Sequence, residues 1–289
     1  MFFFMGMGFF FAKKKILDKS AGGTLSKIVV NLFLPAMAFR VFALGFTTDV
    51  VTEKLKIMLF SSAVLAATTI LAVFIARIFS KNRMTRDIYI YSFAIPNLGM
   101  MAYPLVQGLF PEKFLDTQVF CIVYQLFIYT VGIYLLTPNK KLSFKSLLNP
   151  SLVAIFLGIV TGLLSVKIPG PIDKILVSCN NCVMPIAMIL TGTVFARIDI
   201  KAVLSDWHSY VTAAIRLLII PLGALLVFRL LGIPDEWIFP AVVVLAMPCG
   251  VNSVVFPEAY GGDAVSGAKI CFMSAILAIF TIPLVIALL

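Results

Sequence analysis

Apolar segments, most of them about long enough to cross a bilayer, follow one another along the whole 289-residue chain. After a short first segment they run approximately over residues 24–46, 55–79, 87–109, 115–136, 150–166, 172–196, 207–230, 237–258 and 264–288. Hydrophobic residues make up 61% of the chain and charged residues 12%, far from the balance of a soluble domain. Lipid admits only helices or closed barrels, and barrel-type alternation is not seen. We therefore predict an all-α transmembrane protein with about ten helices.

The first segment is short, with about eleven apolar residues before Lys13, Lys14 and Lys15. A signal peptide has its positive charges before the apolar run and a cleavage site after it. We therefore expect a retained helix, which either begins upstream of this sequence or enters the membrane only partway, because a full span needs about twenty residues.

The net charge of +10 is distributed unevenly between the gaps. Gaps after odd-numbered segments hold 15 Lys and Arg residues, and gaps after even-numbered segments hold 6. Cytoplasmic loops carry such an excess, so the odd-numbered loops are predicted to be cytoplasmic and both termini extracytoplasmic, in a multi-pass protein of the plasma membrane. The bilayer, rather than a nucleic acid, is then the partner of this basic charge. A homodimer is left open.

The two halves of the chain resemble each other. Pro35 and Pro185 lie in similar stretches, and Pro96 and Pro248 do so at nearly the same offset. Five segments per half is an odd number, so the second copy must enter the membrane inverted, as in many secondary transporters. We predict two inverted five-helix repeats, residues 1–140 and 141–289. Chance matching of common apolar residues is the alternative.

Proline and glycine interrupt the fourth and ninth segments at corresponding places. Unwound backbone at membrane depth is tolerated only where it is buried in protein or lines a cavity, and paired interruptions indicate a transporter's substrate site. Half-helix N-termini suit an anion, although simple packing kinks would leave the same pattern. The candidate substrate-binding residues are Pro96, Asn97, Gly99, Pro104, Pro248, Gly250, Asn252 and Ser253, with Asn31, Asn181, Gln125 and Arg216 as second-rank lining residues.

Three charged residues lie inside or beside the apolar segments, and each could have a structural or a functional role. Arg216 could attract a carboxylate substrate, cap a helix end or pair with a buried acid. Arg40 is nearer the end of its segment, and we expect it to extend toward the membrane surface. Asp263 is expected to cap the helix that follows it, although proton coupling is the alternative.

Four stretches carry a resemblance to a known family. PNLGMMAYPL at 96–105 resembles the fourth-helix motif of the auxin efflux carrier family, and AMPCGVN at 246–252 with EAYGGD at 258–263 resembles its ninth-helix motif. LPAMAFR at 34–40 is similar to its second helix. The resemblance implies a ten-helix fold like that of bile-acid sodium symporters, with helices four and nine crossing near mid-membrane and a transport domain moving against a scaffold. It places segment 207–230 in the scaffold, and implies small organic acids such as malate, malonate or lactate as substrates.

We therefore predict a secondary transporter of small organic anions that works by alternating access in an elevator-like manner. No cofactor or metal is expected, and sodium coupling, proton coupling and facilitated efflux all remain open. Five cysteines, including the Cys179–Cys182 pair, are expected to be reduced thiols. No enzyme motif is found, so we predict no catalytic activity. An intramembrane enzyme and a channel-like facilitator are the alternatives.

Overall fold

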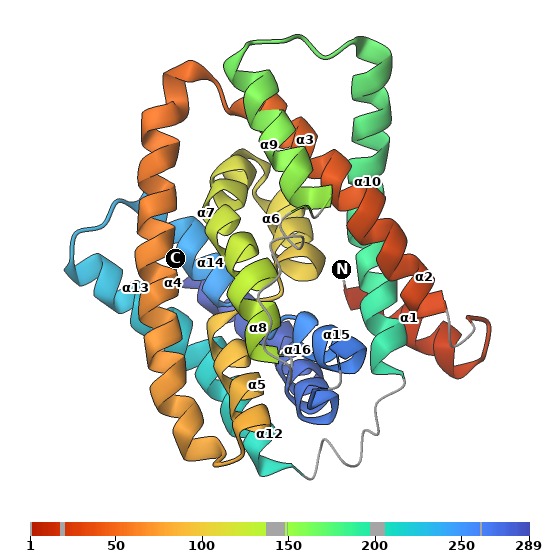
Figure 1. Cartoon of the computed structure of the whole chain (residues 1–289), viewed down its shortest axis with the longest axis vertical. Coiled ribbons are helices and arrows are strands. Elements are labelled where there is room, and N and C mark those ends of the chain that lie inside the picture. Colours follow the sequence, from red (N-terminus) through yellow and green to blue (C-terminus); the bar gives the residue numbers. More distant parts are fainter. Residues whose placement is uncertain (1, 18–20, 137–147, 149, 197–205, 261) are drawn as a thin grey trace. The chain divides into compact units, whose positions relative to one another are not determined.

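The computed structural model describes residues 2–17, 21–136, 148, 150–196, 206–260 and 262–289, and these are mostly helical (Figure 1). The chain forms two compact units. Unit 1 contains Met1–Ile57, Gly99–Val119 and Lys145–Arg197, and unit 2 contains Met58–Leu98, Phe120–Phe144 and Ile198–Leu289. Each unit draws on both predicted halves, so the units are not the repeats. The division into repeats at residue 140 stays a prediction.

Unit 1 is held together by close helix pairs, in which α3 packs against α9 and α1 against α10 (Figure 1). Glycine allows the close approach in both pairs: a Cβ at Gly158 would lie 2.7 Å from the Phe39 carbonyl oxygen, and one at Gly192 would lie 2.7 Å from the Phe9 nitrogen. Arg40 pairs with Asp173 at 2.6 Å, so it binds a carboxylate instead of extending freely. The helices of unit 1 are α1 (Phe2–Lys13), α2 (Ala21–Ile28), η1 (Val29–Phe33), α3 (Leu34–Gly45), η2 (Thr48–Val50), α6 (Tyr103–Leu109), η4 (Pro111–Lys113), α9 (Pro150–Leu163) and α10 (Gly170–Phe195).

Unit 2 is arranged around α16, which contacts α12, α15 and α5. Its helices are α5 (Arg83–Ala94), η5 (Ile128–Gly132), α8 (Ile133–Leu136), α12 (Trp207–Ala214), η7 (Ile215–Ile219), α13 (Ile220–Leu230), α14 (Asp235–Leu245), α15 (Asn252–Tyr260) and α16 (Ala264–Ala287). Three helices have residues in both units: α4 (Val51–Phe79), η3 (Leu98–Ala102) and α7 (Phe114–Phe127). Both segments predicted to be broken are interrupted, since α5 ends before η3 begins and α14 ends before α15 begins.

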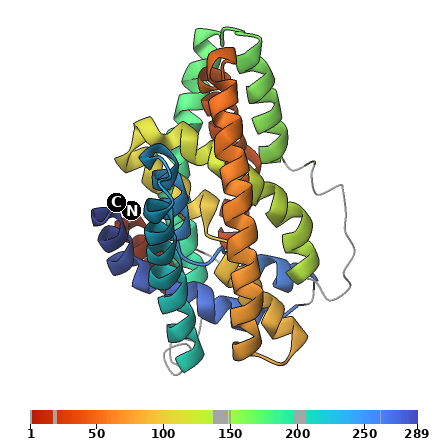
Figure 2. The same cartoon turned by 90° about the vertical axis from the view of Figure 1, so that its left-hand side faces the viewer.

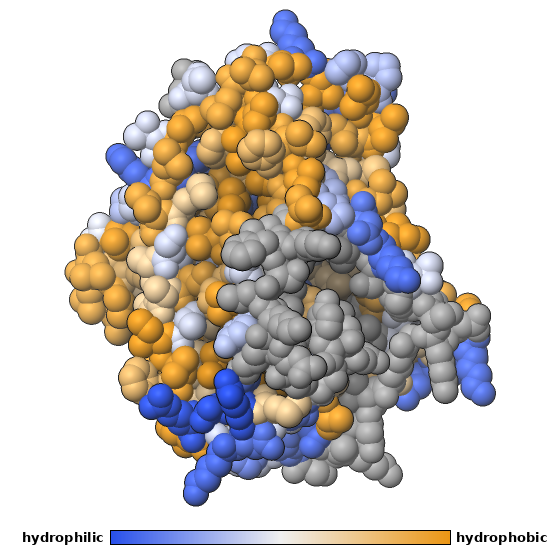
Figure 3. All heavy atoms as spheres, viewed as in Figure 1, coloured by the Kyte–Doolittle hydropathy of each residue, from blue (hydrophilic) through white to orange (hydrophobic). Residues whose placement is uncertain are grey.

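Helix α4 is long and continuous (Figure 2), and its exposed side carries several large apolar side chains, as in a lipid-facing helix. Its exposed side carries Leu59, Phe74 and Ile78, whereas Ser61 and Thr68 are buried. In water this arrangement would leave a large apolar stripe exposed, whereas in lipid it is favourable. Apolar side chains also cover much of the described surface visible in Figure 3.

Among the described residues, four helices are long and apolar enough to cross a membrane, or five if one bent pair counts as a single span. These are Val51–Phe79, Gly170–Leu190, Trp207–Leu230 and Ala264–Ala287, with Pro111–Phe127 and Thr130–Leu136 as the bent pair. The chain is therefore a helical multi-pass membrane protein. The count of ten spans and their inverted repeat stay predictions.

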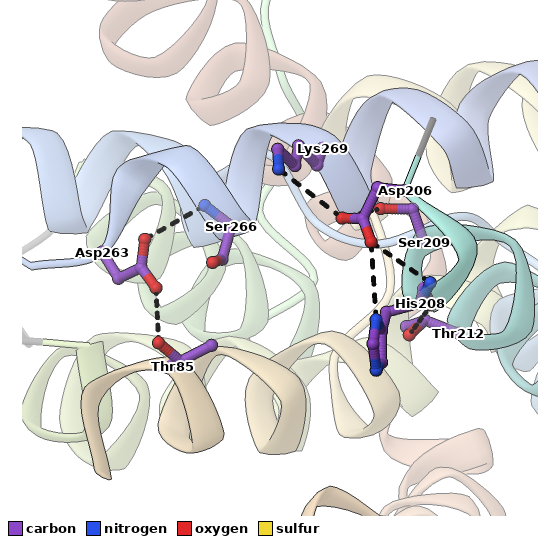
Figure 4. A network of polar contacts seen from close by, with 8 residues as sticks. All are labelled: Thr85, Asp206, His208, Ser209, Thr212, Asp263, Ser266 and Lys269. Carbon is purple, nitrogen blue, oxygen red and sulfur yellow. Dashed lines mark hydrogen bonds and ion pairs between the residues drawn. The ribbon is translucent and has the colours of Figure 1, made fainter. Parts of the chain in front are cut away.

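A polar network joins the starts of α5, α12 and α16 in unit 2 (Figure 4). Asp263 accepts hydrogen bonds from Thr85 Oγ1 at 2.7 Å and from the Ser266 backbone N–H at 3.1 Å, so it caps α16 as predicted. Asp206 lies 3.7 Å from Lys269 Nζ. The network therefore brings together residues from three odd-numbered gaps, those that follow the predicted segments 55–79, 172–196 and 237–258. This is the arrangement expected if these odd-numbered gaps lie on one side of the membrane.

The residues around Asp263 also shift the pKa of its carboxyl group. Burial raises the pKa of its carboxyl, but hydrogen bonds from Ser266 and Thr85 and the charge of Lys269 outweigh burial, so the pKa lies below its ordinary value. Asp263 is therefore a carboxylate at neutral pH and accepts hydrogen bonds in that form.

Candidate functional site

The two broken helices meet at their breaks, inside unit 2. Pro96 and Cys249 form an isolated antiparallel bridge. The Asn97 N–H donates to the Pro248 carbonyl at 2.8 Å, and the Gly250 N–H donates to the Ile95 carbonyl at 3.3 Å. All six residues are buried. The bridge therefore replaces hydrogen bonds that each helix loses at its break.

Pro96 contributes to the break between α5 and η3. In a continuous helix the amide of residue 96 would bond to the carbonyl of Ser92, but Pro96 has no N–H to donate. The amide of Asn97 would bond to the carbonyl of Phe93, but it bonds to Pro248 instead. The Phe93 carbonyl, near the end of α5, is then left for another donor.

Arg216 supplies that donor. Its Nη1 donates to the Phe93 carbonyl at 3.0 Å, and the whole side chain is buried, with an exposed fraction of 0%. Arg216 lies in η7, a π-helical turn of the kind often found at functional sites. A cation is favourable at the C-terminal end of α5, where the helix dipole is negative. Segment 207–230 therefore contacts the first crossing helix within unit 2, and its placement in a scaffold stays a prediction.

Helix α16 fixes the second break from the side. The Cys249 N–H donates to Ser274 Oγ at 3.1 Å, and Ser274 Oγ donates to the Cys271 carbonyl at 3.0 Å. The Cys271 thiol donates to the Cys249 carbonyl at 3.6 Å. Because Ser274 and both cysteines are buried, these bonds hold the extended stretch in a defined position.

The start of α15 follows directly after this stretch. Ser253 Oγ donates to the Gly250 carbonyl at 2.8 Å, and the Ser253 N–H donates to the same carbonyl at 3.0 Å. The Val254 N–H donates to the Val251 carbonyl at 2.9 Å. Two amides of the first turn therefore already have partners, and this helix end is less open than the sequence suggested. Its dipole still presents positive potential beside Asn252.

The predicted site residues fall into two groups. Pro96, Asn97, Pro248, Gly250, Asn252 and Ser253 are brought together at the crossing, and Gln125 and Arg216 also belong to unit 2. The remaining candidates, Gly99, Pro104, Asn31 and Asn181, belong to unit 1.

The unit 1 candidates have local surroundings of their own. Asn31 is exposed and donates to the carbonyl of Lys27, four residues earlier in the chain. Asn181 is exposed on α10. A Cβ at Gly99 would lie 3.0 Å from Leu34 Cδ1. The substrate-binding roles of all the candidate residues, in unit 1 and at the crossing, stay predictions.

Sequence reasoning missed two contributors to the crossing. Ser274 was not selected, although it is an isolated hydroxyl within an apolar run, which is the signal that could have identified it. Phe93 contributes through its backbone carbonyl, and no side-chain pattern could have identified that role.

The crossing offers polar binding groups but no described cluster for metal chemistry. Among the described residues, no group of three or more His, Cys, Asp or Glu side chains could hold a metal ion. The buried polar side chains there include an amide, a hydroxyl and a guanidinium, from Asn97, Ser253 and Arg216. The amide of Asn97 and the guanidinium of Arg216 carry N–H donors, and Arg216 is positively charged, so the crossing is chemically suited to an anion, while the hydroxyl of Ser253 already donates to Gly250.

A family model described as membrane transport protein matches residues 1–144 and 135–286. A search of the curated proteins found no match to the chain.

Proposed function

The chain belongs to the membrane transport protein family, as its resemblance to auxin efflux carriers predicted, and we propose that it is a secondary transporter of small organic anions. That family consists of transporters rather than enzymes, so the prediction of no enzymatic activity is confirmed. The substrates we propose are monocarboxylates or dicarboxylates of the size of lactate, malonate or malate.

The observation that carries this proposal is the backbone bridge between the two broken helices. It holds Asn97 beside Pro248 and fixes the turn that leads into Asn252 and Ser253. Broken helices that meet in this way provide polar groups in an otherwise apolar interior, which is the usual setting of a transporter's substrate site. The cationic Arg216 and the N-terminal end of α15 favour a negatively charged substrate over a positive one.

We further propose that transport proceeds by alternating access, with an elevator-like movement that carries the crossing helices between the two sides. The protein would act in the plasma membrane with both termini outside. Sodium symport, proton coupling and facilitated efflux differ in the gradient that drives them, so imposed gradients separate the three.

The experiment uses purified protein in proteoliposomes and measures uptake of radiolabelled malate, malonate and lactate. Sodium, proton and voltage gradients are imposed separately. We expect saturable uptake of at least one acid, stimulated by unlabelled acid inside the vesicles. Absence of uptake for all three acids under every gradient would refute the proposal. Uptake without saturation or stimulation would support the channel-like facilitator instead.

A double variant, Asn97→Ala with Asn252→Ala, tests the site. We expect strongly reduced uptake, because the polar groups nearest the bridge are removed. A matched double variant, Ser62→Ala with Ser178→Ala, removes exposed hydroxyls that bond only within their own helices and should transport normally. Normal uptake by the asparagine variant would refute the site assignment without affecting the proposed transport.

A further inference from the structure

We propose that Arg216 is the anchor for the substrate's carboxylate, which it binds side-on through Nε and Nη2. This inference rests on the proposed transport of organic anions and adds to it the group that recognises their charge. It follows from which hydrogen-bonding atoms of Arg216 are used in the structure and which are not.

Only one nitrogen of the guanidinium has a hydrogen-bond partner among the described residues. Nη1 donates to the Phe93 carbonyl, whereas Nε and Nη2 are buried and have no partner there. No described carboxylate forms an ion pair with Arg216. Buried charges are normally paired, and buried donors are normally hydrogen-bonded. The two unbonded nitrogens of this fully enclosed arginine therefore indicate a binding site for an anion.

The arrangement of Nε and Nη2 indicates which kind of anion they can bind. Nε and Nη2 lie on one edge of the planar guanidinium, and their N–H groups point the same way. This edge binds a carboxylate with two parallel hydrogen bonds, one to each oxygen. The Phe93 carbonyl occupies Nη1 and so fixes the plane of the group. An anion with two oxygens on one carbon fits the free edge, whereas a neutral amide offers only one acceptor.

The position of Arg216 connects this edge to the crossing. The carbonyl to which it donates belongs to Phe93, three residues before Pro96 of the bridge. A carboxylate on Arg216 would therefore lie in the same interior as Asn97 and Ser253. Because Arg216 is fully enclosed in this structure, an anion reaches it only when the surrounding side chains separate, and such closed states are part of alternating access.

The test measures binding of lactate and of its amide, lactamide, to purified protein. Wild type should bind lactate far more tightly than lactamide. Arg216→Gln should weaken lactate binding by about 10- to 150-fold, the loss expected for hydrogen bonds to a charged group, and should leave lactamide binding nearly unchanged. Arg216→Lys keeps the charge but not the two parallel N–H groups, so its affinity for lactate should lie between those of wild type and Arg216→Gln. Arg229→Gln, an exposed arginine at the end of the same helical run, should bind like wild type.

The outcomes separate the two proposals. If wild type binds and transports none of the organic acids, the proposed function fails. If wild type transports them but Arg216→Gln keeps its preference for lactate over lactamide, only the role of Arg216 fails, and the arginine serves to stabilise the end of α5. If Arg216→Gln does not fold, the lactate preference of Arg216→Lys decides: a preference equal to that of wild type would overturn the proposal.

Discussion

Replacing Gly267 with alanine should disrupt the start of α15, because no space exists for a side chain there. A Cβ at this position would lie 2.8 Å from the carbonyl carbon of Ser253 and still closer to its oxygen. Ordinary contact begins at 3.4 Å, so α15 and α16 would have to separate by more than half an ångström. The obstructing atoms are backbone, which cannot rotate away as a flexible side chain would.

The size of the effect follows from two opposing contributions. Alanine favours a helix over glycine by about 1 kcal/mol, while overpacking a tight contact costs about 1–3 kcal/mol. Gly223→Ala is the matched control, because Gly223 is also in a helix of unit 2 and a Cβ there meets no atom within 4 Å. The propensity gain is common to both variants, so the difference between their free energies of unfolding, about 1–3 kcal/mol, isolates the clash. Gly250→Ala should show a smaller clash, since its Cβ would lie 3.2 Å from the Pro96 carbonyl oxygen.

Thermal unfolding in detergent provides the assay, read with a fluorophore that reacts with newly exposed thiols. Cys249 and Cys271 are buried, so they react only when unit 2 opens. We expect stability to decrease in the order Gly223→Ala, Gly250→Ala, Gly267→Ala, with transport following the same order. If Gly267→Ala is as stable as Gly223→Ala, then the close approach of α15 and α16 does not exist in the protein.

Three further predictions concern other contacts. Ser274→Ala should lower the free energy of unfolding by about 1–3 kcal/mol in denaturation experiments, because it leaves the buried N–H of Cys249 without an acceptor. Asp263→Asn should be less stable than wild type at pH 6, and the difference should shrink as the pH falls through the lowered pKa of Asp263, because protonation removes the same charge from wild type. In a variant without native cysteines, Lys81→Cys should react with an impermeant maleimide from the cytoplasmic side and Lys167→Cys from the outside, as the charge distribution predicts.

Each of these predictions has a control and a contrary result. Ser62→Ala removes an exposed hydroxyl that bonds within its own helix, so its stability should be close to that of wild type. A stability difference for Asp263→Asn that stays constant down to pH 2 would show that the charge of Asp263 is not the cause. Labelling of Lys81→Cys from the outside would reverse the predicted orientation.

The sequence predicted the helix breaks because their cause is local. Proline at 96 and 248 lacks an amide hydrogen, and each of these prolines has an asparagine or glycine within two residues, which together favour an interruption. Proline alone does not interrupt a helix, since α10 continues through Pro185 and α16 through Pro283. The partners of the freed backbone groups could not be predicted, since the bonds between Asn97 and Pro248 and between Cys249 and Ser274 depend on tertiary packing.

The charged residues show the same division between local and distant causes. Asp263 caps the helix beside it, as its position in the sequence indicated. Arg40 pairs with Asp173, 133 residues away, and no local pattern announces that contact. For Arg216 the sequence left three readings open, and the structure shows the arginine at a helix end with no acid partner among the described residues.

The hydrogen bonds between the two breaks also have a consequence for how the chain inserts into the membrane while it is being synthesised. The ribosome makes Asn97 about 150 residues before Pro248, which is roughly 8 to 30 s at ordinary elongation rates. During that interval the amide of Asn97 and the carbonyl of Ile95 lack the partners they have in the finished protein. Unpaired backbone groups are costly in lipid, so the newly made fourth segment should remain shallow, hydrated or bound by the insertion machinery until the ninth segment arrives. Truncation between the two breaks should therefore leave an early half that is inserted incompletely, even though its own segments are apolar enough to enter.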